Sequence, residues 1–186
     1  MMQYEPISAG NYYHIYNRGN NYEDIFIEDR NYEYFLNLVA RHLTSVLEVL
    51  SYCLLKNHFH MIVRTFDNTE DHLISRKFSN LFNAYAKSIN KAYGRNGSLF
   101  KDRFSRKKID QENYLRNLII YVHLNPTKHF GIDFKTYKYS SYQAFISNKR
   151  TLLNRDFVLG LFDDEPNFKA AHCLTTFDPN NEYLLE

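Results

Sequence analysis

Tryptophan is absent from this sequence and cysteine is rare, since the chain of 186 residues contains only Cys53 and Cys173. Two cysteines so far apart exclude a disulfide framework and a zinc site built on cysteine thiolates. We therefore expect a reduced protein of the cytoplasm. Cys53 lies in an apolar stretch, where we expect it to be a buried packing residue and not a reactive thiol.

Long apolar runs are also absent. No stretch approaches the ~20 apolar residues that cross a bilayer. The first segment, MMQYEPISAG, has neither the basic region nor the apolar core of a signal peptide. The glycine-rich phosphate-binding loop of many nucleotide-dependent enzymes is missing as well. These absences predict no membrane partner and no nucleotide cofactor.

The remaining composition is typical of a folded globular protein. Hydrophobic residues make up 44% of the chain and charged residues 24%, which is not the composition of a disordered protein. The length is sufficient for a core without covalent cross-links. We expect one main domain, residues 1–150, and an acidic C-terminal extension, residues 151–186, that packs on the domain or flanks it. The 16 tyrosines and 15 phenylalanines mostly serve packing, so abundant tyrosine is not itself evidence of catalysis.

The expected elements occur in the order β-α-β-β-α-β, followed by a helix. Periodicity and turn residues place strands at 11–17, 46–55, 58–65 and 104–109, helices from Asp29, at 71–93 and at 110–126, and a short helical segment near 155–162. Lys56 and Asn57 predict a tight turn within a hairpin, and Pro126 is expected to stop the third helix.

This order is the split βαβ pattern. It predicts an α+β, ferredoxin-like sandwich, in which helices lie on one face of an antiparallel sheet, with a C-terminal helical extension. The fold supports many functions, so it does not identify one.

Charge is distributed unevenly along the chain. Between Lys87 and Lys108 there are eight basic residues and one acid, Asp102, a net charge of +7, whereas the whole chain has +2. From Asp163 onward, six acids face one lysine. A concentrated basic block predicts a polyanion site, although a solvated charged face has the same composition.

The tetrapeptide NHFH places two histidines two positions apart on a predicted strand. Because side chains alternate along a strand, His58 and His60 share one face, about 6–7 Å apart. Phe59, Met61 and Val63 then face the core. Two imidazoles at this distance can bind one metal ion. The same spacing also occurs in strands whose histidines bind nothing.

A second polar pair lies on the third predicted helix. Tyr121 and Asn125 are four residues apart, so they share a helix face. A tyrosine hydroxyl is a weak nucleophile unless it is activated. A divalent ion held by two imidazoles and an amide oxygen would make a nearby phosphate more electrophilic. His123 lies about 200° round the helix from Tyr121 and is a weaker ligand candidate. In a tyrosine-rich chain, such a pair also arises by chance.

Several motifs together resemble one known family. LLKNHFHMIV, GSLFKDRF, YVHLNP and YSSY occur in the order and approximate spacing of the single-tyrosine His-hydrophobe-His transposases, in particular those associated with repetitive extragenic palindromes. HIYNRGNN resembles the opening of these proteins. The resemblance covers about residues 12–145, and it is the combination of motifs that is specific.

The resemblance implies a metal-dependent endonuclease and strand transferase that cuts single-stranded DNA at or near palindromic hairpins. Tyr121 matches the family's nucleophile, which forms a 5′-phosphotyrosine link and frees a 3′-hydroxyl. His58 and His60 match its metal-binding pair, and Asn125 matches the position of a third polar ligand. The implied ion is Mg²⁺ or Mn²⁺, and the implied partner is hairpin-forming single-stranded DNA. Both a monomer and a homodimer are compatible with the family.

The basic block then becomes the expected DNA surface. Its cations would contact phosphates and set affinity without selecting a sequence. Phe100 and Phe104, interleaved with them, would either stack on unpaired bases or pack in the core. The candidate DNA-binding residues are Lys87, Lys91, Arg95, Arg103, Arg106, Lys107 and Lys108.

Three alternatives remain open. A replication-initiation or conjugative nicking enzyme uses the same chemistry but usually has further domains. An RNA-recognition module shares the split βαβ fold, but its signature is missing here. A non-catalytic or domesticated relative would bind nucleic acid without cutting it, and the presence of His58, His60 and Tyr121 argues against this alternative.

Overall fold

The central sheet has four antiparallel strands in the order β2-β3-β1-β4. The computed structural model describes residues 6–174. Its strands are β1 (Tyr12–Arg18), β2 (Leu47–Leu55), β3 (His58–Thr65) and β4 (Ser105–Ile109). β2 and β3 form a hairpin around Lys56 and Asn57. The predicted ferredoxin-like fold class and its hairpin are confirmed.

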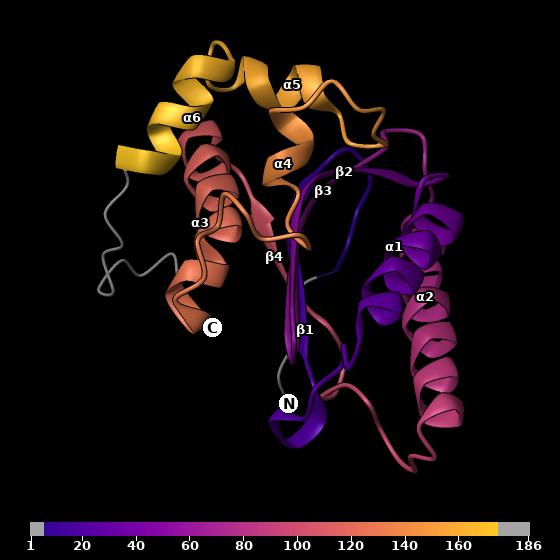
Figure 1. Cartoon of the computed structure of the whole chain (residues 1–186). Coiled ribbons are helices and arrows are strands. Elements are labelled where there is room, and N and C mark those ends of the chain that lie inside the picture. Colours follow the sequence, from indigo (N-terminus) through magenta and orange to yellow (C-terminus); the bar gives the residue numbers. More distant parts are fainter. Residues whose placement is uncertain (1–5, 175–186) are drawn as a thin grey trace.

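Two helices cover one face of the sheet (Figure 1). They are α1 (Asp29–Leu43) and α2 (Asp71–Ala92), and a 3-10 turn, η1 (Asn20–Tyr22), precedes them. A buried aromatic cluster joins the layers: the ring of Phe59 on β3 lies 5.2 Å from that of Phe35 on α1 and 5.6 Å from that of Phe82 on α2. Burying a side chain of this size contributes roughly 1.5–3 kcal/mol. These rings therefore hold both helices on the sheet.

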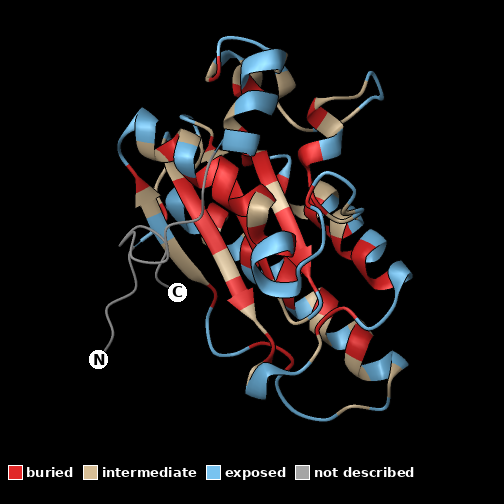
Figure 2. Cartoon of the chain, turned by 60° about the vertical axis from the view of Figure 1, so that its left-hand side comes forward, coloured by how far each residue is buried: buried red, intermediate tan, exposed pale blue. Residues whose placement is uncertain are grey.

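The opposite face is covered by the third helix and the C-terminal helices (Figure 1). They are α3 (Glu112–Phe130), α4 (Tyr142–Phe145), α5 (Arg155–Gly160) and α6 (Glu165–Leu174). Buried residues extend through the strands and the inner sides of the helices, as Figure 2 shows. The middle of α3 is buried on all sides because it lies between the sheet and α6. The sheet therefore lies between two layers of helices, α1 and α2 on one face and α3 to α6 on the other.

The helix α3 does not stop at Pro126, so this prediction was wrong. It continues for another turn to Phe130 and is capped by Gly131, whose φ of 63° is left-handed. Proline removes the amide that would bond to the carbonyl of Val122. The side-chain amide of Asn125 partly replaces it, since Nδ2 donates to the carbonyl of Tyr121 at 2.8 Å and lies 3.5 Å from that of Val122. The helix therefore tolerates its proline.

Side chains of β3 alternate between the two faces, as predicted. Phe59 and Met61 belong to the core under α1 and α2. Ile62 belongs to the core under α3, and the strand period of two places His58 and His60 on the same side as Ile62. The two histidines therefore face α3.

Cys53 lies opposite His60 on β2 and is fully buried. Burial raises the pKa of its thiol well above the usual range, which confirms its packing role. Among residues 6–174, no helix is both long and apolar enough to cross a membrane.

A buried polar network attaches the C-terminal helices to α3. Nδ1 of His123 on α3 lies 2.8 Å from Nε2 of His172 on α6, and its Nε2 lies 2.7 Å from Oγ of Ser141. Oγ of Ser141 in turn accepts a hydrogen bond of 2.9 Å from the amide of Tyr52 on β2. His123 therefore faces away from the side of α3 on which Tyr121 lies, as its position round the helix predicts.

Both histidines of this network are neutral in the fold. Burial lowers the pKa of His123 well below the usual range and lowers that of His172 to about 4. The rest of the predicted acidic extension, residues 175–186 with Asp178, Glu182 and Glu186, lies outside the described residues.

The buried His172 is expected to make stability depend on pH. The unfolded chain protonates this imidazole near pH 6.5, whereas the folded chain resists protonation down to about 4. Stability therefore falls as the pH decreases through this window. Between pH 7.5 and pH 5, this residue should contribute a loss of about 2 kcal/mol. Urea denaturation should show a flatter pH dependence for His172→Gln than for the wild type.

The control is His72→Gln, because the His72 side chain is 71% exposed. It should keep the wild-type pH dependence. The same pH dependence in His172→Gln and the wild type would show that the buried imidazole does not act in this way.

Candidate functional site: a histidine pair facing a tyrosine

The hairpin fixes the positions of His58 and His60. In the register between β1 and β3, His58 lies opposite Arg18 and His60 lies opposite Tyr16. The two imidazole rings are 5.4 Å apart between centroids and nearly perpendicular, at 88°. His60 is buried, whereas His58, beside the turn, is partly exposed. The pair therefore lies at one end of the sheet, with one ring accessible.

The turn before His58 is anchored to neighbouring backbone. The carbonyl of Lys56 accepts two hydrogen bonds of 2.9 Å from the segment before α1, and the carbonyl of Asn57 accepts one of 2.7 Å from the amide of Gly19. Gly19 has no room for a side chain, because a Cβ there would lie 1.9 Å from the carbonyl oxygen of Glu23. The turn is therefore a firm support for His58.

His14 belongs to the site but was not predicted from the sequence. Its Nε2 lies 2.9 Å from Nδ1 of His60, and it is buried, at 6% exposure. The ring of Tyr16 lies 4.8 Å from that of His14. Alternation along β1 places His14 and Tyr16 on one face, but only the register with β3 brings them to His60. That register is a tertiary property, so the local sequence gave no sufficient signal.

Both histidines of the pair use Nδ1 in a hydrogen bond. Nδ1 of His58 lies 2.7 Å from Oδ1 of Asn57, and Nδ1 of His60 bonds to His14. An amide oxygen only accepts, so His58 donates from Nδ1 and has its lone pair on Nε2. His60 has the same tautomer, with its lone pair on Nε2, when Nε2 of His14 accepts the hydrogen bond from Nδ1 of His60. Metal-binding histidines typically make such a bond with the ring nitrogen that does not bind the metal.

Tyr121 approaches the pair from α3. Its ring stands edge-on to that of His60, with 5.8 Å between centroids, and the residue is 5% exposed. Nζ of Lys128, on the same helix, lies 3.4 Å from the phenol oxygen and 4.8 Å from the ring centroid. A cation at this distance stabilises negative charge on the phenol oxygen. Lys128 was not predicted, because it follows the expected stop at Pro126.

Asn125 lies between two points of contact along α3. Tyr121, Asn125 and His129 are spaced by four residues and share one face. Tyr121 contacts His60, and the ring of His129 lies 4.9 Å from that of His58. Asn125 is therefore placed over the histidine pair. It is fully buried, and its Oδ1 has no hydrogen-bond partner among the described residues.

These residues fit a divalent cation. His58 and His60 could hold it through ring nitrogens and Asn125 through Oδ1, with further positions for water or phosphate oxygens. The buried Oδ1 supports this fit, because a buried carbonyl oxygen without a partner costs about 1–3 kcal/mol. Within residues 6–174, no group of three or more His, Cys, Asp or Glu side chains is arranged for a metal. The amide oxygen of Asn125 is the candidate for a third ligand.

The basic candidates do not form one patch. Lys107 lies on the histidine face, because it stands opposite His14 in the register of β1 and β4. Arg95 forms an ion pair with Glu23, so an intramolecular acid already neutralises its charge. Of these two residues, Lys107 is the better placed to contact a phosphate at the site.

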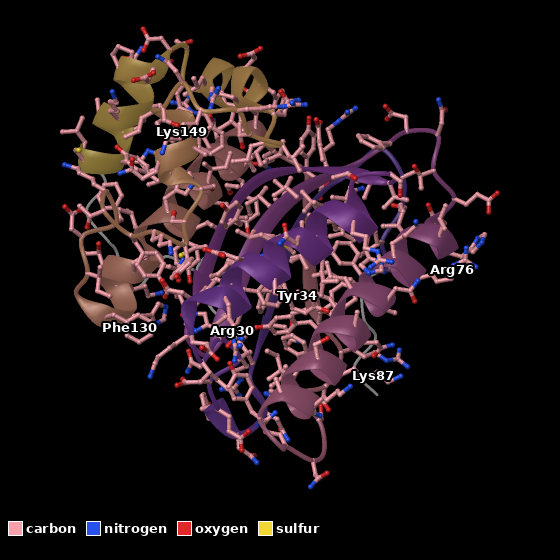
Figure 3. All side chains as sticks on the ribbon, turned by 45° about the vertical axis from the view of Figure 1, so that its right-hand side comes forward. Arg30, Tyr34, Arg76, Lys87, Phe130 and Lys149 are labelled. Carbon is pink, nitrogen blue, oxygen red and sulfur yellow. The ribbon has the colours of Figure 1, made fainter. Side chains whose placement is uncertain are left out.

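The other candidates lie away from the histidine face. Lys87 and Lys91 are exposed on α2, and Figure 3 shows Lys87 far from Phe130, which marks the end of α3. The remaining three are Lys108, which pairs with Asp110 at 3.5 Å, and Arg103 and Arg106, which line a groove beside α2. The basic block is therefore continuous in sequence but not in space, because part of it lies on α2 and the side chains of β4 alternate between the two faces of the sheet.

Comparison with solved structures finds this fold in a REP-associated tyrosine transposase that was solved bound to a REP hairpin. The match has a TM-score of 0.63 and 17% sequence identity, and it covers 80% of this chain and 87% of that one. A putative transposase from Deinococcus radiodurans matches with a TM-score of 0.44 and 12% identity, covering 63% of this chain and 93% of that one. No protein-family model and no curated protein matches the sequence. The first match agrees in fold with the resemblance seen in the sequence motifs.

The last turn of α3, with Lys128 and His129, is expected to depend on Gly131. Its φ of 63° costs a residue with a Cβ roughly 1–2 kcal/mol, so Gly131→Ala should lower the free energy of unfolding by about 1 kcal/mol. The matched control is Gly160→Ala, because Gly160 has open space around it and no positive φ. It should be neutral or stabilising by up to about 1 kcal/mol. Equal destabilisation of the two variants in urea denaturation would contradict this role.

Proposed function

We propose that this protein is a single-stranded DNA endonuclease and strand transferase of the transposase type, with Tyr121 as its nucleophile. The main support is the position of Tyr121, whose ring lies 5.8 Å from that of His60 and whose phenol oxygen lies 3.4 Å from Nζ of Lys128. The fold that holds these groups is shared with a REP-associated tyrosine transposase. Because that protein was solved with a REP hairpin, we propose hairpin-forming single-stranded DNA as the substrate here.

The proposed reaction is a transesterification at phosphorus. Oη of Tyr121 attacks a backbone phosphate, the Oη–P bond forms and the P–O3′ bond breaks. The phenol loses its proton, and the departing 3′ oxygen takes up a proton to become a hydroxyl. The downstream DNA fragment stays attached through its 5′ phosphate as a phosphotyrosine ester. A 3′-hydroxyl that attacks this ester reverses the same bonds, so rejoining needs no nucleotide hydrolysis.

The side chains around Tyr121 have separate roles in this proposal. Lys128 stabilises the phenolate before attack and when the ester is broken. His58, His60 and Asn125 hold Mg²⁺ or Mn²⁺, which when bound would polarise the phosphate and stabilise its developing charge. His14 holds the His60 ring in its tautomer through the bond at Nδ1. Lys107 lies on the same face and contacts the DNA backbone.

The nucleophile is tested by covalent capture. A labelled hairpin oligonucleotide with an unpaired flank is incubated with the protein and Mn²⁺, and adducts are separated on a denaturing gel. We expect an adduct with the wild type and none with Tyr121→Phe, which lacks the attacking oxygen. Tyr34→Phe, an exposed change on α1, should form the adduct at the wild-type rate. An adduct that persists in Tyr121→Phe would exclude this residue as the nucleophile.

The metal ligands are tested in the same assay. His58→Ala and His60→Ala should each reduce the rate of adduct formation by about a hundred-fold or more, and EDTA should abolish it. His72→Ala, at an exposed position on α2, should have no effect. Undiminished cleavage in the double variant His58→Ala/His60→Ala would remove the metal from the proposal. Salt-sensitive retention of the hairpin without any adduct would instead indicate a non-catalytic nucleic-acid-binding protein.

A further inference from the structure

The imidazole of His172 joins α6 to the helix that carries Tyr121. The two helices lie side by side (Figure 1). Nε2 of His172 lies 2.8 Å from Nδ1 of His123 on α3, and its Nδ1 lies 2.7 Å from the carbonyl oxygen of Phe168 on α6. His172 is only 1% exposed. A side chain buried this deeply does not touch a substrate, so its influence on a reaction at Tyr121 passes through α3.

The hydrogen bonds of this network all point in one direction, from β2 to α6. A carbonyl oxygen only accepts, so the neutral His172 has its proton on Nδ1, and its Nε2 accepts from Nδ1 of His123. The neutral His123 then has its lone pair on Nε2, which accepts from the hydroxyl of Ser141 at 2.7 Å. The oxygen of Ser141 accepts in turn from the amide of Tyr52 at 2.9 Å. Each bond in such a chain strengthens the next by polarisation.

Aromatic rings hold the imidazole of His172 at the end of this chain. Ring centroids lie 4.3 Å away for Phe168, 5.1 Å away for Tyr142 and 5.9 Å away for Phe162. The ring of Phe134, which follows α3, is stacked on the imidazole at 6.1 Å. Close packing of this kind leaves a buried side chain little freedom. His172 is therefore a fixed acceptor for the His123 proton.

The bonds of His123 restrict the rotation of α3 about its own axis. His123 and Tyr121 project from opposite sides of the helix, about 200° apart. The phenol oxygen of a tyrosine on a helix lies roughly 8 Å from the helix axis, so a rotation by about 10° moves it by roughly 1.4 Å. Apolar packing is non-directional and permits such a small rotation, whereas a hydrogen bond weakens when its angle changes.

A displacement of this size is large for a reacting group. Misplacing such a group by about 1 Å can reduce a rate about a hundred-fold. The same rotation displaces Asn125, which shares the helix face of Tyr121. The two bonds of His123 therefore act on the nucleophile and on a candidate metal ligand together.

We propose that His172 and Ser141 are positioning residues for the reaction of Tyr121: through His123 they fix the rotation of α3, and thereby the approach of the phenol oxygen to the scissile phosphate. The inference rests on the proposed function. Loss of a bond at either end of His123 slows the covalent attack. DNA affinity does not change, because His172 and Ser141 are buried and lie behind the helix.

The test separates the rate of attack from the affinity for DNA. His172→Leu removes the acceptor for the His123 proton, whereas His172→Gln keeps one, its Oε1, at a similar reach from the backbone. With saturating hairpin DNA and Mn²⁺, single-turnover adduct formation should be at least about ten-fold slower in His172→Leu, and within about three-fold of the wild type in His172→Gln. Fluorescence anisotropy should give hairpin affinities within about two-fold of the wild type for both.

A second variant and a control separate positioning from stability. Ser141→Ala removes the hydroxyl that donates to Nε2 of His123, and it should slow adduct formation without changing the affinity. Val39→Ala is the control, because Val39 is buried under α1 on the opposite face of the sheet and its truncation lowers stability without touching α3. At a temperature where urea denaturation shows every variant to be folded, Val39→Ala should react at the wild-type rate.

Three results would refute the positioning role. They are a wild-type rate in both His172→Leu and Ser141→Ala, a rate in His172→Gln as low as that in His172→Leu, and a loss of rate in Val39→Ala equal to that in His172→Leu. In each of them the wild type still forms its adduct. Failure of the proposed function differs, because then the wild type itself forms no adduct.

Discussion

The site depends on the packing of α3 against β3. Tyr121 contacts His60 and His129 contacts His58, so the helix runs antiparallel to the strand across the histidine face. Two residues along a strand advance about 6.6 Å, whereas the eight residues from Tyr121 to His129 advance about 12 Å along the helix. The two contact residues of α3 are therefore farther apart than the two histidines, and their side chains converge on the pair. Asn125 lies midway between them, over the two rings.

The other side of the same helix turn holds α3 in place. His123, two residues after Tyr121, faces the opposite direction and is bonded to both His172 and Ser141. These bonds connect α3 to α6 and, through Ser141, to β2, which is the hairpin partner of the histidine strand. The C-terminal helices thus fix the height and rotation of α3 above the sheet. The position of Tyr121 over the sheet therefore depends on the hydrogen bonds that His123 makes on the opposite side of α3.

Much of this arrangement was predictable from local patterns, and the remainder depends on tertiary contacts. Alternation along NHFH predicted which face of β3 the histidines occupy, and helical spacing predicted that Tyr121 and Asn125 lie together. The rule that proline ends a helix gave the wrong end for α3, because the Asn125 side chain bonds to the carbonyls beside Pro126. Because of this error, Lys128 and His129 on the last turn of α3 were not predicted as residues of the site. His14 depended on strand register, and the basic block is continuous only in sequence, because β4 directs Arg106 and Lys107 to opposite faces.

The most direct measurement of the central claim is the identity of the residue that becomes attached to DNA. Trypsin cleavage after Arg116 and Lys128 releases NLIIYVHLNPTK, in which Tyr121 is the single tyrosine. After the adduct formed with Mn²⁺ is digested with nuclease and trypsin, mass spectrometry should find the nucleotide on this peptide. A nucleotide on a peptide that contains Tyr16 or Tyr114 would contradict the account, because then the tyrosine that α3 holds over His58 and His60 would not be the one that reacts.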